Sequence, residues 1–207
     1  MLHPCFISYV HPEGDWARAA INLAVNALRS ALEVDFGRER PPYIDTDRLN
    51  PGANHASQLA QAICNSACMV ILYYPAYGYS DYCQRELQAM RQIEQCRRRL
   101  LGGKLDAYRM FIPIVLRGRA QDLPDFVHRD CVWLDYSRQL LTSRDISGTT
   151  QVRERFFRVV DTISALCRVL DEAQAARGID CRGFQLPASG ATSGPAAPPE
   201  LPFPGRA

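Results

Sequence analysis

Glu86 and Tyr82 are the two residues whose types and spacing suggest chemistry most clearly. They follow an apolar run at 69–74 that is typical of a buried strand. A helix beginning near Ser80 would place both side chains on one face, because residues four apart are neighbours on a helix. An aromatic ring suits a flat base and a carboxylate suits ribose hydroxyls, so the pair indicates a nucleotide-binding site.

The start of the chain is predicted to reach the same place. The apolar run at 5–9 predicts the first strand, with Tyr9 and His11 where it ends. In an open doubly wound sheet with strand order 2-1-3-4-5, ligands bind outside the carboxyl ends of strands one and three. We therefore expect one crevice to collect the following side chains: Tyr9, His11, Asp45, Ser80, Tyr82 and Glu86.

Each of these side chains also has an ordinary structural interpretation. Glu86 could be a solvated residue in the first turns of a helix, where the helix dipole favours negative charge. Polar groups at strand ends and helix starts commonly cap the next turn, which would explain Asp45 and Ser80. The two tyrosines are, by themselves, typical packing residues. Residue type and spacing alone leave both interpretations open.

The elements that must position these residues follow from hydrophobic periodicity. Strands are predicted at 5–9, 42–45, 68–74, 110–116 and 131–134, and the main helices at 15–32, 53–65, 80–98 and 150–177. Their alternation predicts an α/β fold, a flavodoxin-like doubly wound five-stranded parallel sheet with helices on both faces. One domain is expected at 1–178. Proline, glycine, alanine and serine dominate 179–207, which predicts a disordered tail.

The composition is that of an ordinary globular protein, 47% hydrophobic and 22% charged. No apolar run approaches the roughly 20 residues that span a bilayer. The first residues lack the basic leader and apolar stretch of a secretory signal. We therefore expect a cytoplasmic protein without a membrane anchor.

Several function classes are disfavoured. The net charge of +2 gives no general field for nucleic acid, and the dense basic cluster Arg97-Arg98-Arg99 is interpreted as a solvated helix end. The absence of a glycine-rich phosphate loop argues against a dehydrogenase or a kinase, and no cofactor is expected. The eight cysteines are scattered without metal-ligand spacing and are interpreted as buried free thiols, so no metal is expected either.

Short motifs follow one another along the chain: Phe6-Ile7-Ser8-Tyr9, Tyr43-Ile44-Asp45 with Leu49-Asn50-Pro51-Gly52, the segment at 80–87, Ile112-Pro113-Ile114 and Trp133-Leu134-Asp135. Their order and spacing resemble the Toll/interleukin-1 receptor (TIR) domain family over roughly residues 5–170. Each motif is weak alone, and the specificity comes from the series.

The resemblance implies that Glu86 is the catalytic residue that cleaves nicotinamide from NAD+, a substrate rather than a cofactor. Catalytic members carry a tryptophan at the position of Tyr82. The same pattern implies a ribose and nicotinamide pocket lined by Tyr9, Val10, His11 and Asp45, with Ser80 and Tyr82 beside the carboxylate. It also implies a BB loop through which TIR domains stack on one another, here Arg48, Leu49, Asn50, Pro51 and Gly52.

One carboxylate is enough for this chemistry, because the nicotinamide of NAD+ is already a cation and leaves without a general acid. The carboxylate stabilises the oxocarbenium-like ribose that remains. The resemblance thus implies an NAD+ glycohydrolase or ADP-ribosyl cyclase of the standalone bacterial antiphage type, assembling homotypically and working with a separate sensor or effector. A non-catalytic TIR–TIR adaptor and an N-ribosyl transferase are the alternatives.

Overall fold

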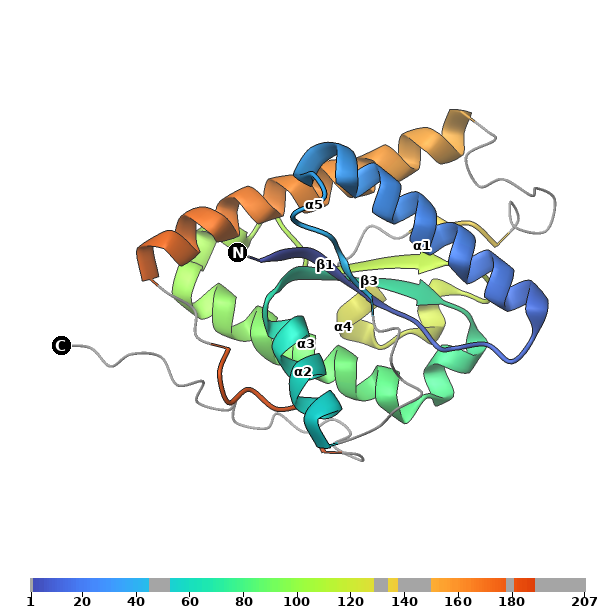
Figure 1. Cartoon of the computed structure of the whole chain (residues 1–207), viewed down its shortest axis with the longest axis horizontal. Helices are drawn as coiled ribbons and strands as arrows, with labels where there is room; N and C mark the ends of the chain where they lie inside the picture. The colour runs from blue at the N-terminus through green and yellow to red at the C-terminus, as the bar shows by residue number, and fades with distance from the viewer. Residues whose placement is uncertain (1, 45–52, 129–133, 138–149, 178–180, 189–207) are drawn as a thin grey trace.

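The computed structural model describes residues 2–44, 53–128, 134–137, 150–177 and 181–188. Its centre is a sheet of five parallel strands in the order β2-β1-β3-β4-β5 (Figure 1). This confirms the predicted flavodoxin-like doubly wound fold. The strands are β1 (His3–Ser8), β2 (Tyr43–Ile44), β3 (Ser66–Tyr73), β4 (Phe111–Val115) and β5 (Leu134–Asp135).

The strand β3 forms the middle of the sheet, and all of its residues are buried. It pairs with β1 on one side, where Ile7 lies opposite Val70, and with β4 on the other, where Ile112 lies opposite Val70. A strand that is covered on both faces has no polar face, which explains its continuous apolar sequence. The carboxyl ends of β1 and β3 are therefore neighbours at one edge of the sheet.

Helices cover both faces of the sheet. Figure 1 shows α1 and α5 on one side of the strands, with α2 and α3 on the other. The α-helices are α1 (Asp15–Phe36), α2 (Ala53–Cys64), α3 (Asp81–Leu101), α4 (Asp125–His128) and α5 (Thr150–Arg177). Three short 3-10 helices lie between these elements: η1 (Pro75–Tyr79), η2 (Gly102–Leu105) and η3 (Ala120–Asp122).

Local signals set the ends of α3, the helix that carries Glu86. Ser80 is its N-cap, and the Ser80 hydroxyl accepts a hydrogen bond from the backbone N–H of Cys83 at 3.3 Å. Gly102 ends the helix at a φ of 54°, a conformation that favours glycine. The helix predicted from sequence is confirmed, with its start beside the end of β3.

The basic cluster at the end of α3 differs from the prediction. Arg99 is exposed, but Arg97 is only 1% exposed and donates hydrogen bonds to backbone carbonyl oxygens beneath the helix. The interpretation of all three arginines as a solvated helix end is therefore wrong for Arg97. Arg97 is buried because it lies on the face of α3 that packs against the sheet, the face that also carries Ile93 one turn earlier.

The segment 181–188 corrects two further predictions. Cys181 forms a disulfide with Cys64 at the end of α2, so these two cysteines are not free thiols. Phe184 is buried, and the Arg85 Nε donates a hydrogen bond to the carbonyl oxygen of Pro187 at 2.7 Å. The tail expected from residue 179 is thus packed on the domain over 181–188. Residues 189–207 and Cys131 lie outside the described residues.

The other cysteines within the described residues are free and buried, as predicted: Cys5, Cys68, Cys83, Cys96 and Cys167. None of the helices in the described parts of the chain combines the length and apolar composition needed to cross a bilayer.

Candidate active site

The candidate site lies at the carboxyl ends of β1 and β3, where the strand order predicts a ligand crevice. Ser8 is the last residue of β1, and its hydroxyl donates a hydrogen bond to the Glu86 Oε2 at 2.5 Å. Glu86 comes from the second turn of α3, so this bond joins residues 78 apart in the sequence. The carboxylate is therefore directed toward the end of the first strand, as the sequence predicted.

A second hydroxyl adds to this contact. The Tyr77 hydroxyl lies 2.7 Å from the Ser8 Oγ. Because Ser8 has a single hydroxyl hydrogen and donates it to Glu86, Tyr77 is the donor in this second bond. The result is a hydrogen-bond chain, which we call the Tyr77–Ser8–Glu86 chain.

All three residues of the chain have no exposed surface. Burying a carboxylate is unfavourable unless hydrogen bonds replace the lost water. The Ser8 hydroxyl supplies one such bond, and a hydrogen bond to a charged acceptor is stronger than one between neutral groups. The burial and the hydrogen bond of Glu86 therefore argue against two interpretations of this residue, a solvated helix residue and a simple packing residue.

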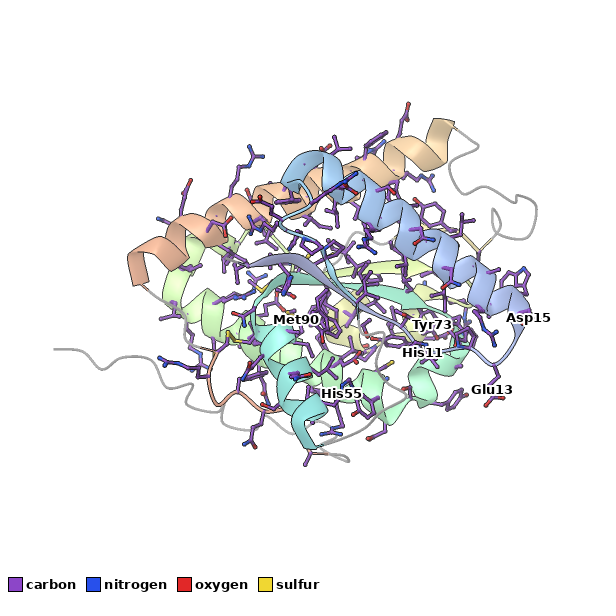
Figure 2. All side chains as sticks on the ribbon, viewed as in Figure 1. His11, Glu13, Asp15, His55, Tyr73 and Met90 are labelled. Atoms are coloured by element: carbon purple, nitrogen blue, oxygen red, sulfur yellow. A yellow bond between two sulfur atoms is a disulfide. The ribbon has the colours of Figure 1, made fainter. Side chains whose placement is uncertain are left out.

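The residues that follow β1 line the edge of this region. Tyr9 is 9% exposed, and its ring centre lies 5.0 Å from that of His11, which is exposed. The Tyr74 hydroxyl donates to the carbonyl oxygen of Val10 at 3.1 Å and so links the loop after β1 to the end of β3. Figure 2 shows His11 and Tyr73 at the same end of the sheet, the end at which α1 begins.

Tyr82 lies on the α2 side of the site. Its half-buried ring is 6.5 Å from the ring of His55, and the guanidinium of Arg85 lies 5.7 Å from the same ring. His55 stands in the first turn of α2 (Figure 2), and its side chain is buried. Its neighbourhood with Tyr82 results from the packing of α2 against α3.

The predicted site residues are thus placed as follows. Glu86, Tyr9, Val10 and His11 gather around the end of β1, and Tyr82 lies one turn before Glu86 on α3. Ser80 acts as the helix cap, which was its structural alternative, and its contact with a substrate stays a prediction. Asp45 and the predicted BB loop at 48–52 lie outside the described residues.

Sequence reasoning missed three residues here: Ser8, Tyr77 and His55. The sequence indicates Ser8 only as part of the motif Phe6-Ile7-Ser8-Tyr9, and it does not single out Tyr77 or His55 as site residues. No spacing rule links either residue to Glu86, because their bonds join separate elements. Within the described residues, no group of three His, Cys, Asp or Glu side chains is placed to hold a metal ion.

Comparison with known proteins assigns the family. The family described as TIR domain matches residues 5–152. No curated protein matches the chain. The match covers more than half of the sequence and includes the whole of β2, β3, β4, β5 and α3, together with β1 from Cys5 onward. The chain belongs to the TIR domain family.

Proposed function

We propose that this TIR domain cleaves NAD+, as a glycohydrolase or an ADP-ribosyl cyclase, with Glu86 as the catalytic carboxylate. The observation that carries the proposal is the buried Glu86 side chain tied to the last residue of β1. An ionisable group buried at a ligand-binding edge of a parallel sheet is a candidate functional group on physical grounds. A domain that only docks has no chemical need for it.

The reaction breaks the bond between ribose C1 and the pyridinium nitrogen of nicotinamide. The bonding pair leaves with nicotinamide, which becomes neutral, and the ribose develops positive charge. The Glu86 carboxylate stabilises that charge. Attack by water then gives ADP-ribose and a proton, whereas attack by a nucleophile of the same molecule gives a cyclic product.

The aromatic and polar neighbours suit the rest of the substrate. Tyr82 offers a half-buried ring face beside the carboxylate, a suitable surface for a flat pyridine or adenine ring. Tyr9 and His11 offer a second aromatic pair at the end of β1. Asp45, by the family resemblance, would contribute a carboxylate to the ribose hydroxyls.

Glu86 has no exposed surface, so a substrate reaches it only after neighbouring groups move. TIR domains commonly associate with one another, and we propose that homotypic assembly produces the open form. A bacterial antiphage role, with a separate sensor or effector protein, is part of the same proposal. Activity is then expected to rise with protein concentration more steeply than in direct proportion.

The test compares nicotinamide release by the wild type, Glu86→Gln and Glu94→Gln over a series of protein concentrations. Glu94 is the matched control, because it lies on the same helix and pairs with Arg98 at 2.8 Å, away from the end of β1. We expect Glu86→Gln to lose on the order of 100-fold or more in rate and Glu94→Gln to keep its rate. Equal release by a folded Glu86→Gln protein would exclude Glu86 from the mechanism.

Glu86 has no surface that a substrate can reach in this form of the domain, and this inaccessibility favours one second candidate, a non-catalytic adaptor that recruits other TIR domains. In an adaptor, a Glu86→Gln variant keeps its full biological activity and its assembly, and no protein concentration gives nicotinamide release. Product analysis with an added free base distinguishes hydrolysis from N-ribosyl transfer.

A further inference from the structure

We propose that Ser8 and Tyr77 are positioning residues, whose hydroxyl groups fix the orientation of the Glu86 carboxylate for catalysis. The inference rests on the proposed cleavage of NAD+. It assigns a role to the Tyr77–Ser8–Glu86 chain as a unit, from the phenol hydroxyl through the serine hydroxyl to the carboxylate oxygen.

The chain joins three separate elements at one point. Ser8 ends β1, Tyr77 lies in η1 after β3, and Glu86 stands on α3. The two bonds, at 2.7 and 2.5 Å, run in one direction, since each hydroxyl accepts from the group before it and donates to the group after it. A hydroxyl that accepts a hydrogen bond becomes a better donor, so Tyr77 strengthens the contact between Ser8 and Glu86.

Tyr77 is itself held firmly at the junction of β3 and α3. Its backbone N–H donates to the carbonyl oxygen of Tyr74 at 2.8 Å, and its own carbonyl oxygen accepts from the N–H of Ser80 at 3.2 Å. Its buried ring packs edge-on against Tyr73, with ring centres 6.1 Å apart. The phenol hydroxyl therefore has a fixed position from which to orient Ser8.

Such restraint matters because glutamate has three rotatable side-chain bonds. A catalytic group that moves by about 1 Å from its productive position can lose on the order of 100-fold in rate. A serine on a central strand and a tyrosine in a short turn supply the rigid support that a carboxylate on a helix needs. The chain thus places Glu86 relative to the sheet rather than to its own helix alone.

The experiment measures kcat and KM for NAD+ cleavage in Ser8→Ala, Ser8→Thr and Tyr77→Phe. The matched control is Tyr73→Phe, a hydroxyl deletion on the neighbouring buried ring. Burial raises the pKa of Tyr73, so its phenol stays protonated at neutral pH. Circular dichroism and thermal melting report on folding in each variant.

We expect kcat to fall about tenfold or more in Ser8→Ala and about threefold in Tyr77→Phe, with KM changed less than threefold. Ser8→Thr keeps a hydroxyl and restores most of kcat, and Tyr73→Phe leaves kcat unchanged. In a Glu86→Gln background, Ser8→Ala causes no further loss, because the group on which it acts is gone. If Ser8 and Tyr77 had a purely structural role, their variants would lower the melting temperature without this selective fall in kcat and without its rescue by Ser8→Thr.

The outcomes separate this inference from the proposed function. If the wild type cleaves NAD+ and Glu86→Gln does not, unchanged or increased kcat in both Ser8→Ala and Tyr77→Phe overturns the inference alone. Tyr77→Phe keeps the ring and therefore decides the matter even if Ser8→Ala fails to fold. A wild type that releases no nicotinamide at any concentration overturns the proposed function and the inference with it.

Discussion

Arg97 is a buried cation whose guanidinium binds backbone carbonyl oxygens. Its Nη1 donates to Ser66 and Ala67 at 2.8 and 3.1 Å, and its Nη2 donates to Cys64 at 2.8 Å. Burial lowers the pKa of Arg97 to about 10, which leaves it charged at neutral pH. The side chain thus connects the end of α2, the start of β3 and the helix α3.

We therefore predict that Arg97→Met lowers the free energy of unfolding by about 3 kcal/mol, because buried carbonyl oxygens lose their donors. Arg99→Met is the control, since Arg99 is exposed on the same helix, and its effect is expected to stay within about 0.5 kcal/mol. Urea unfolding measures both. Equal stability of the two variants would show that the bonds of Arg97 contribute nothing net.

The candidate site shows what a sequence carries at the scale of single residues. Glu86 and Tyr9 were predicted from strand ends and helix spacing, which depend on local periodicity and on the ligand-binding edge of parallel sheets. Ser8 and Tyr77 were not predicted, because their significance lies in hydrogen bonds between residues that are 69 and 78 positions apart in the sequence. No local pattern encodes which buried hydroxyl meets which carboxylate.

At the scale of elements, the hydrophobic pattern predicted the strands and the principal helices. The continuous apolar run of β3 correctly predicted that this strand lies in the centre of the sheet. The packed segment 181–188 was missed, because its composition resembles a disordered tail and its attachment depends on two distant contacts. These contacts are the disulfide from Cys181 and the hydrogen bond from Arg85 to Pro187.

The disulfide between Cys64 and Cys181 closes a loop with a sequence separation of 117 residues. A bond of this kind restricts the unfolded chain and typically contributes about 2–4 kcal/mol. We predict that a dithiol reductant, which converts the disulfide to two thiols, lowers the free energy of unfolding of the wild type by about that amount.

The Cys181→Ser variant is the control for this prediction. Its stability is expected to match that of the reduced wild type and to be unaffected by reductant. Urea unfolding of the four samples, with and without dithiothreitol, makes the comparison. A wild type whose unfolding curve does not respond to reductant, once alkylation has confirmed reduction, would contradict it.

At the scale of the whole molecule, buried thiols make the free energy of unfolding depend on pH in the alkaline range. Burial raises the pKa of Cys167 to about 12, and burial also raises the pKa of Cys5 and of Cys68. In each case the folded pKa lies above the ordinary value of 9.0. The contribution of these protonated thiols to the stability of the folded state is therefore fully present below pH 9 and is lost as the pH rises toward 12.

We predict that the free energy of unfolding falls between pH 9 and pH 11, and that Cys167→Ala reduces the slope by about 1 kcal/mol per pH unit. Val160→Ala is the control, because it also truncates a buried side chain on α5 but removes no titratable group. We expect it to keep the wild-type slope of the free energy of unfolding against pH. Urea unfolding at half-unit pH steps measures the slopes. Identical slopes in the wild type and Cys167→Ala would contradict the prediction.

The whole fold also sets the condition for activity. Glu86 is enclosed where the end of β1, η1 and α3 meet, so the proposed dinucleotide substrate would need an opened form of this edge of the sheet. In the proposed reaction, the enclosed Glu86 carboxylate becomes the group that stabilises the ribosyl cation.

The most direct measurement is time-resolved detection of nicotinamide and of its co-product, ADP-ribose or a cyclic ADP-ribose-type compound, by mass spectrometry at protein concentrations that allow assembly. We predict nicotinamide and one of these co-products with the wild type and with Glu94→Gln, and on the order of 100-fold slower formation with Glu86→Gln. Nicotinamide release by folded Glu86→Gln at the wild-type rate would contradict the account.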